Sequence, residues 1–285
     1  MTTAPAQWPG FDGTPHEAIR CSARSGTLQE FLERLGQELH RARGEPCPLG
    51  LPAVLAPAYA VDLFGFVRSY HRAVETIVRA QRHDPEVRRV VALPRALRAD
   101  TEAGCQPDDD RIHLCRVDII PDPDGGFKAI ETNANCPAAL MSSGVAGRRW
   151  REHLAGSGLN FPAPLDHERP NWMARWFLDT AHAETGSYPD FVVLFREEGG
   201  RRLELPGFLE ELRNEGVDAI EADPRELTIS SGGSPFLRGR EVFHGYLKLG
   251  IRELARMRPD LDAFMKVLRD RRLFVQNGVR GRLIG

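Results

Sequence analysis

The sequence predicts an α/β protein, and two patterns carry that prediction. Residues 191–195 form an apolar run typical of a buried strand, residues 206–214 repeat apolar side chains at helical spacing, and residues 217–221 form a second short strand. Strand, helix and strand at this spacing make a βαβ unit, which favours a parallel sheet. Residues 114–133 instead form two strands around a Pro-Asp-Gly-Gly turn, which is typical of an antiparallel hairpin.

Amphipathic helices are predicted before the hairpin. Residues 27–42 open with a Thr-x-x-Glu capping box and repeat large apolar side chains at helical spacing. A second helix is predicted over residues 58–82, and Asp84 is an N-cap followed by Pro85 at the start of a third helix. Residues 1–26 are rich in Gly, Pro, Thr and Ser, so we expect them to be irregular.

The second half of the chain contains further helices and strands. Proline-rich residues 162–170 form a predicted linker, which divides the chain into residues 1–165 and residues 166–285. No Gly-x-Gly-x-x-Gly motif follows the strand at 191–195, so a dinucleotide-binding role is unsupported. The remaining predictions are helices over residues 145–154, 171–186, 251 onwards and 261–270, and strands over residues 227–229, 241–248 and 273–275.

Composition argues against several classes of function. The 285 residues carry a formal net charge of −2, which gives no reason to expect a nucleic acid or an anionic membrane as partner. The cysteines are odd in number, widely spaced and without a Cys-x-x-Cys pair, which argues against a zinc site or a disulfide scaffold. The N-terminus has no signal-peptide pattern and no apolar segment approaches membrane-spanning length, so we expect a cytoplasmic protein.

One face of the predicted hairpin gathers polar side chains. Alternate residues of a strand share a face, so Arg116 points the same way as Asp118, and Glu131 the same way as Asn133. If the strands pair around the turn, a cation, two carboxylates and an amide oxygen meet on that face. Such a hard, all-oxygen set suits Mg²⁺ that is also bound by a substrate phosphate. The alternative is a solvated hairpin face, on which alternating charge is ordinary.

These residues resemble a known motif. Arg-x-Asp, a glycine-containing turn, an apolar residue before Glu-x-Asn and a Pro-Ala-Ala run together resemble the metal-binding hairpin of ATP-grasp ligases. The order of segments from about Leu51 onwards resembles the circularly permuted branch of that family, which includes glutathionylspermidine synthase. The resemblance implies that Asp118, Glu131 and Asn133 hold Mg²⁺ ions that bridge the phosphates of ATP. It also implies that Arg116 faces the transferred phosphoryl group.

The resemblance also implies an architecture. Residues 1–165 would contain a helical lead-in and an ATP-grasp-like metal-binding lobe with the antiparallel hairpin. Residues 166–285 would form a small Rossmann-like, pre-ATP-grasp domain on the substrate side and begin the following lobe. In permuted ATP-grasp enzymes the nucleotide-binding lysines and a glycine-rich loop follow a segment like this one, and neither Lys248 nor Lys266 matches those lysines. By this resemblance the sequence is either part of a longer protein that continues past Gly285 or a short protein that lacks a complete ATP site.

Small and hydroxyl side chains follow the hairpin. Residues 137–144 lead into a predicted helix, and Ser142 and Ser143 are candidates to bind an anionic group of the cofactor or a substrate carboxylate at the helix N-terminus. The alternative is plain N-capping by either serine. Cys136 lies beside the predicted metal site, but no histidine lies near it in sequence, so we do not predict a nucleophile. The acidic run at 107–110 is predicted to be a solvated loop.

The predicted function is ATP-dependent ligation of a small-molecule carboxylate to an amine, giving an amide or peptide bond. By resemblance, ATP phosphorylates the carboxylate, and the amine then displaces phosphate from the acyl phosphate. Mg²⁺ and Arg116 would neutralise the charge that develops during phosphoryl transfer. Two alternatives stay open. A metal-dependent hydrolase could use the same carboxylates to activate water, and a non-catalytic binding module could use the same face without turnover.

Overall fold

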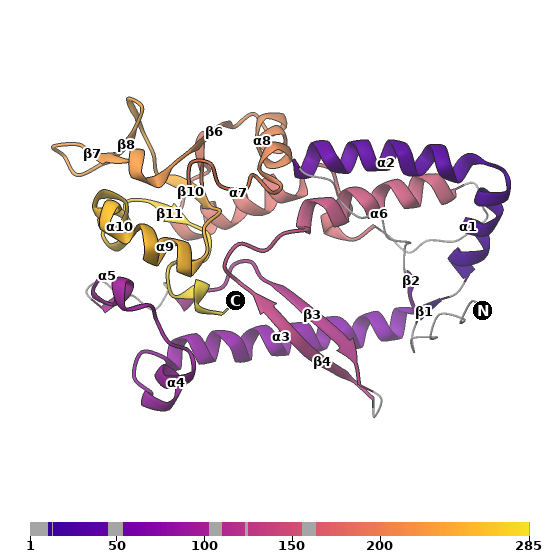
Figure 1. Ribbon diagram of the computed structural model, residues 1–285, viewed down its shortest axis with the longest axis horizontal. Helices are drawn as coiled ribbons and strands as arrows, with labels where there is room; N and C mark the ends of the chain where they lie inside the picture. The colour runs from indigo at the N-terminus through magenta and orange to yellow at the C-terminus, as the bar shows by residue number, and fades with distance from the viewer. Residues whose placement is uncertain are drawn as a thin grey trace.

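The computed structural model describes residues 11–12, 14–44, 54–102, 110–122, 125–155 and 164–284. These residues contain a four-stranded parallel sheet, an antiparallel hairpin and a three-stranded antiparallel sheet, together with many helices. The α/β class predicted from the sequence is therefore confirmed (Figure 1). No helix in these residue ranges is both long and apolar enough to cross a membrane.

The parallel sheet has the strand order β11–β10–β5–β6. β5 (Phe191–Phe195) pairs with β6 (Asp218–Ala222) on one side and with β10 (His244–Leu247) on the other, and β11 (Phe274–Val275) pairs with β10. Every residue of β5 is buried, as its uninterrupted apolar run indicates. The crossover from β5 to β6 contains α8 (Leu205–Asn214), so the predicted βαβ unit is confirmed.

Helices cover both faces of the parallel sheet (Figure 1). The odd-numbered residues of β5 belong to the core cluster that also contains side chains of α9 (Ile251–Met257) and α10 (Asp262–Arg269). The even-numbered residues of β5 belong to the cluster that contains side chains of α7 (Trp172–Thr185) and α8. Successive side chains of a strand point to opposite faces, so one apolar strand supplies both cores.

The predicted strand over residues 241–248 is wrong as a single element. β9 (Arg240–Glu241) pairs with β8 (Pro235–Leu237), which pairs with β7 (Thr228–Ile229), in the three-stranded antiparallel sheet. After Val242 the chain crosses into the parallel sheet and continues as β10. Apolar residues continue through this crossing, so nothing in the local sequence marks the change of sheet.

The N-terminal helices differ from the prediction in two ways. α1 (Thr14–Arg24) is helical, although composition predicts an irregular segment there. It packs in the same core cluster as α2 (Thr27–Arg43) and α6 (Leu140–Leu154), and tertiary packing of this kind supplies most of the stability of a short helix. Gly26, with φ of 81°, is the N-cap of α2, so Thr27 is already helical and the predicted capping box does not form.

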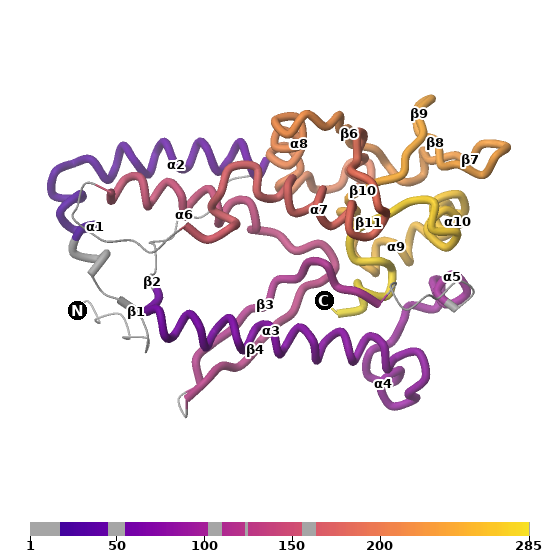
Figure 2. Tube along the Cα trace, turned by 180° about the vertical axis from the view of Figure 1, so that it is seen from behind, coloured from indigo at the N-terminus to yellow at the C-terminus, as the bar shows by residue number. Residues whose placement is uncertain are grey.

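A long helix, α3 (Pro57–Ala80), supports the hairpin. The hairpin strands β3 (Arg116–Pro121) and β4 (Phe127–Asn133) pair antiparallel, which confirms the predicted hairpin. In both views the hairpin lies across α3 (Figures 1 and 2). The ring of Phe127 packs on two aromatic rings of α3, so an aromatic cluster fixes the turn end of the hairpin to the helix.

Shorter elements complete the described chain. The Asp84 side chain accepts hydrogen bonds from the first backbone N–H groups of α4 (Pro85–Val90), so the predicted N-cap is confirmed. The division of the chain near residue 165 stays a prediction. The remaining elements are β1 (Phe11–Asp12), β2 (Val54–Leu55), α5 (Arg98–Glu102) and the 3₁₀ helices Arg95–Leu97, Asp166–Glu168, Pro224–Glu226, Arg258–Asp260 and Gly281–Leu283.

The C-terminal segment ties the hairpin to the parallel sheet. Asn277, which is buried just after β11, accepts a hydrogen bond at Oδ1 from the backbone N–H of Leu114 (2.9 Å). Its Nδ2 donates to the carbonyl oxygens of Leu114 and Ala134, the second at 2.7 Å. Leu114 precedes β3 and Ala134 follows β4, so one side chain holds both ends of the hairpin beside the parallel sheet.

Candidate functional site

The hairpin register brings the four predicted residues of its polar face together. Arg116 lies opposite Asn133, and Asp118 lies opposite Glu131. The Nε of Arg116 donates to Oδ1 of Asp118 (2.8 Å), and its Nη2 lies 3.8 Å from Oε1 of Glu131. One guanidinium therefore contacts both carboxylates. The Oδ1 of Asn133 accepts a hydrogen bond from the backbone N–H of Asn135 (3.2 Å).

A β-bulge lies beside these carboxylates. The register shifts after Asp118 and leaves Ile130 as an extra residue on β4. Across this shift Phe127 and Thr132 both contact α3, the second through a hydrogen bond to the hydroxyl of Tyr70 (2.8 Å). Residues an odd number apart in a regular strand point to opposite faces, so the bulge is what places both on α3. It also leaves the polar face turned away from that helix.

The polar face is open to solvent and fits a magnesium ion. The exposed fraction is 43% for the Asp118 side chain and 59% for the Glu131 side chain. With the Asn133 amide they offer three oxygen-bearing side chains, and Mg²⁺ fills its other positions with water or phosphate oxygens. No group of three or more His, Cys, Asp and Glu side chains suited to a metal occurs in the described ranges. A metal site on this face therefore needs the Asn133 amide oxygen as a third ligand. A metal ion bound here would share the Asp118 carboxylate with the Arg116 guanidinium.

The chain leaving β4 runs from the polar face to the carboxyl edge of the parallel sheet. Lys248, directly after β10, donates from Nζ to the carbonyl oxygen of Pro137 (3.3 Å). The Nη1 of Arg116 lies 3.5 Å from the carbonyl oxygen of the next residue, Ala138. Two cations from distant parts of the sequence therefore meet the same short segment. Sequence reasoning misses Lys248 in this role, because its only signal is a position just after a buried strand.

Burial changes the chemistry of Lys248. Its surroundings exclude water and lower the pKa of the ammonium below its usual value, while Cys136 and Glu204 act in the opposite direction. An amine with a lowered pKa releases its proton more readily than an exposed lysine. The carboxyl edge of the parallel sheet beside the hairpin therefore holds a second cation, Lys248, besides Arg116.

Arg282 is a buried cation at the junction of hairpin and sheet. Its guanidinium donates to the carbonyl oxygens of Leu247 (3.0 Å), Leu249 (2.8 Å) and Gln276 (2.9 Å), and also to that of Asn135. These carbonyls lie at the carboxyl ends of β10 and β11 and in the segment after β4. Burial lowers the pKa of Arg282 to about 10. Charge-assisted hydrogen bonds to three segments make this junction stiff.

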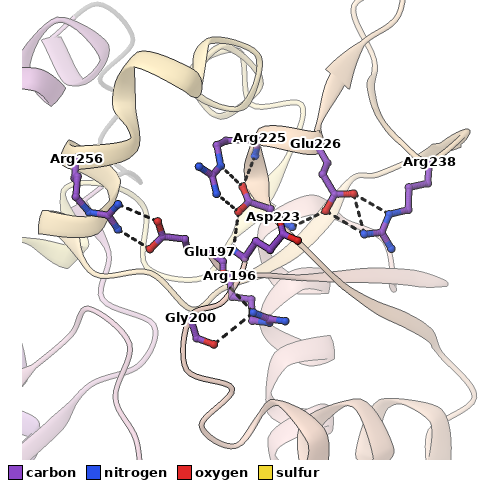
Figure 3. Close-up of polar contacts among 9 residues, drawn as sticks. Arg196, Glu197, Gly200, Asp223, Arg225, Glu226, Arg238 and Arg256 are labelled. Carbon is purple, nitrogen blue, oxygen red and sulfur yellow. Dashed lines mark hydrogen bonds and ion pairs between the residues drawn. The ribbon is translucent and has the colours of Figure 1, made fainter.

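The carboxyl ends of β5 and β6 carry paired charges (Figure 3). Glu197 follows β5, and Arg256 of α9 donates to it (2.9 Å) and lowers the pKa of its carboxyl group. Asp223 follows β6 and accepts from Arg225 (2.7 Å) and from the backbone N–H of Glu198 (2.7 Å). Burial raises the pKa of Asp223, but these hydrogen bonds outweigh it and the pKa is lowered. Both carboxylates are therefore ionised and already neutralised by arginine.

The carboxylate of Glu204, from the chain itself, caps the N-terminus of α6. α6 begins at Leu140, before the predicted start, so Ser142 and Ser143 lie inside its first turn. The Oε1 of buried Glu204 accepts from the backbone N–H groups of Met141 (3.0 Å) and Ser142 (3.1 Å) and from the Ser142 hydroxyl (3.3 Å). The Ser143 hydroxyl donates to the carbonyl oxygen of Leu140 (2.9 Å). Anion binding by these serines stays a prediction, and Glu204 is the anion at this helix end.

Two further features have structural explanations. A Cβ atom on Gly144 would lie 1.9 Å from the carbonyl oxygen of His167, so close packing requires the small residue there. Asp110, expected in a solvated loop, is instead buried, and its carboxylate pairs with Arg82 (2.9 Å) and Arg280 (2.9 Å). Ion pairing offsets the cost of burying this charge. Residues 107–109 of the same loop lie outside the described residues.

The chain matches no model of a known protein family, and no curated protein sequence matches it.

Proposed function

We propose that the chain carries the metal- and phosphate-binding lobe of a cytoplasmic ATP-dependent carboxylate–amine ligase, with an ATP-grasp-like hairpin and a Rossmann-like domain on the substrate side. The observation that carries this proposal is the pairing of Asp118 with Glu131 across the hairpin, with Arg116 in contact with both. Exposed carboxylates beside a guanidinium match the needs of a metal-bound triphosphate. The resemblance of the Arg-x-Asp and Glu-x-Asn motifs to ATP-grasp hairpins supports the same reading.

Each residue of the face has a proposed role. Asp118, Glu131 and Asn133 would hold Mg²⁺, which when bound neutralises charge on the phosphates. Arg116 presents a fixed fork of N–H donors, which suits the oxygens of the transferred phosphoryl group. Lys248, which contacts the segment next to Arg116, would hold the carboxylate of the acid substrate.

The proposed reaction has two steps. An oxygen of the acid attacks the γ-phosphorus of ATP, the bond to the β-phosphate oxygen breaks, and ADP leaves. The amine nitrogen then attacks the acyl carbon, the bond between that carbon and the phosphate oxygen breaks, and phosphate leaves with the electron pair. The nitrogen loses a proton as the amide forms. A ligase must keep water from the acyl phosphate, since water would compete with the amine.

The test is an assay of the purified protein, including any further natural lobe, with Mg-ATP, a pool of small carboxylates and a pool of small amines. We expect ADP and phosphate in equal amounts, formed only when acid and amine are both present. Asp118→Asn and Glu131→Gln should each abolish this turnover. Phosphate release that needs no amine would contradict the ligase and favour the hydrolase instead.

The matched control lies on the same hairpin. Asp122 pairs with Lys128 (2.9 Å) near the turn, four residues beyond Asp118. Asp122→Asn removes a carboxylate from the hairpin without touching the predicted metal ligands, so it should keep full turnover. Equal losses in this variant and in Asp118→Asn would show that general damage to the hairpin, not loss of a ligand, explains the effect.

A further inference from the structure

A pocket with a volume of about 450 Å³ lies at the amino edge of the parallel sheet. Its lining includes His244 at the start of β10, Phe274 at the start of β11 and Ser187 shortly before β5. Lys248 and the hairpin face lie at the carboxyl ends of the same strands, so the pocket is separate from the candidate site. Ligand pockets commonly enclose roughly 300–1,000 Å³, so this one can hold a small molecule.

One wall of the pocket is apolar. Phe243 contributes a side chain that is 46% exposed, and its carbonyl oxygen accepts a hydrogen bond from the backbone N–H of Phe274 (2.9 Å). Met265 and Leu268 of α10 extend this wall with aliphatic surface. Contact with an apolar ring would remove the exposed aromatic surface from water, which is favourable.

The lining is also basic. The lining contains four arginines and two carboxylates, and the basic run at residues 269–272 supplies most of the positive charge. Both carboxylates have arginine partners outside the lining, and Arg269 of the lining also lies 3.8 Å from Asp100. Asp100 accepts from Arg258 (2.9 Å), and Glu184 accepts from Arg111. Arg280 is paired with Asp110 (2.9 Å), so exposed Arg271 and Arg272 contribute most to a positive potential that favours an anion.

Arg272 is held over this pocket by the neighbouring antiparallel sheet. Its Nη1 donates to the carbonyl oxygen of Gly232 (3.3 Å), in the turn between β7 and β8. A guanidinium has five N–H donors, so one bond to a carbonyl leaves it able to bind an oxyanion through two parallel bonds. The side chain is exposed, so it can reach a ligand without unfolding any element.

The histidines of the pocket are hydrogen-bonded and uncharged near neutral pH. The Nδ1 of His113 accepts from the backbone N–H of Asn277 (3.0 Å), so its Nε2 carries the proton and donates to Glu184 (3.3 Å). A hydrogen bond joins His244 to the hydroxyl of Thr185 (3.2 Å). Burial lowers the pKa of both imidazoles. They add polar surface, and the arginines alone supply the positive charge.

We propose that this pocket binds a small organic anion, with an apolar, ring-sized body against Phe243 and Phe274 and a carboxylate or phosphate group on Arg272. The carboxylate and the phosphate share the oxyanion chemistry that a guanidinium recognises. The inference does not depend on the proposed ligase activity, because the two sites lie at opposite edges of the sheet and share none of these residues.

The test uses 1-anilinonaphthalene-8-sulfonate, which joins an apolar ring system to an anionic group and fluoresces when bound. We expect saturable binding of one molecule per chain. Arg272→Gln should weaken the affinity by about tenfold or more, since it removes a charge-assisted pair of hydrogen bonds, and Phe243→Ala should weaken it as well. Arg213→Gln, which changes an exposed arginine on α8, is the matched control and should bind like wild type.

Competition identifies the ligand class. 2-Naphthoate or 2-naphthyl phosphate should displace the probe, and the stronger of the two shows whether a carboxylate or a phosphate is preferred. The neutral 2-naphthalenemethanol should not compete. Equal competition by the neutral alcohol, or wild-type affinity in Arg272→Gln and Phe243→Ala, would overturn the proposal. Thermal unfolding of both variants checks that each one is folded before its affinity is compared.

Discussion

Asp118 and Glu131 lie directly opposite each other on β3 and β4, and the guanidinium of Arg116 contacts both, at 2.8 Å and 3.8 Å. Like charges directly opposite in an antiparallel pair are destabilising. The arginine offsets part of this repulsion but leaves both carboxylates substantially exposed. Such an exposed pair of carboxylates beside a bulge is better explained by ligand binding than by a contribution to the stability of the hairpin.

Removal of one charge from this pair should not weaken the fold. Glu131→Gln relieves the repulsion between Glu131 and Asp118 and loses only the longer contact to Arg116. We expect the free energy of unfolding, measured by urea denaturation, to stay the same or rise by up to ~0.5 kcal/mol. Tyr70→Phe is the opposing control, because it breaks the hydrogen bond to Thr132 and should cost about 1 kcal/mol. A loss of 2 kcal/mol or more in Glu131→Gln would mean that this carboxylate is structural.

Arg116 should matter more for chemistry than for nucleotide affinity. Arg116→Lys keeps a positive charge but replaces the fork with a point charge, which fits the planar oxygens of a transferred phosphoryl group poorly. We expect a much larger fall in turnover than in the affinity for Mg-ATP, with both measured on the same preparation. Equal falls in the two quantities would instead make Arg116 a residue that binds the ground state.

Glu204 should be the main support of the start of α6. Its carboxylate accepts three hydrogen bonds there, two of them from backbone N–H groups. Glu204→Ala leaves these donors without a partner, so we expect a loss of about 2 kcal/mol in the free energy of unfolding. Ser142→Ala removes only the longest of the three and should cost about 0.5–1 kcal/mol. If Ser142→Ala costs as much as Glu204→Ala, the serine hydroxyl, not the carboxylate, stabilises this helix end.

Stability should fall in mildly acidic solution because of the buried histidines. Burial lowers the pKa of His113 and His244 below the ordinary value of 6.5. The unfolded chain then binds more protons than the folded one below that value, so stability is complete above about pH 6.5 and falls as the pH drops towards the lowered pKa. We expect a lower urea midpoint at about pH 5.5 than at about pH 7.5. His244→Gln should show a smaller fall than wild type, and an identical fall would contradict this assignment.

Local patterns in the sequence predict the parts of the fold that depend on local rules. The uninterrupted apolar run of β5 identifies a strand buried on both faces, and the βαβ unit follows from its spacing to α8 and β6. Alternation in the hairpin identifies the shared face of Arg116 and Asp118, and the turn sets the pairing with Glu131. Each of these predictions uses contacts between residues close together in the chain.

The remainder of the candidate site depends on contacts between distant residues. Lys248 meets Pro137 across 111 positions, and Arg282 meets Asn135 across 147 positions, so no local pattern marks either cation. Glu204 caps a helix that begins 64 residues earlier, so no local pattern marks this contact either. The bulge at Ile130 is also invisible, because regular alternation places Phe127 on the same face as Glu131.

The binding of Mn²⁺ tests the metal-binding role of the hairpin most directly, since Mn²⁺ accepts the same oxygen ligands as Mg²⁺ and its free form is counted by electron paramagnetic resonance. We expect wild type to bind Mn²⁺ more tightly when ATP is present, because phosphate oxygens complete the coordination. Asp118→Asn and Glu131→Gln should each weaken this binding by about tenfold or more, whereas Asp122→Asn should leave it unchanged. Equal Mn²⁺ affinity in wild type and in both ligand variants would contradict the assignment of this face as a metal site.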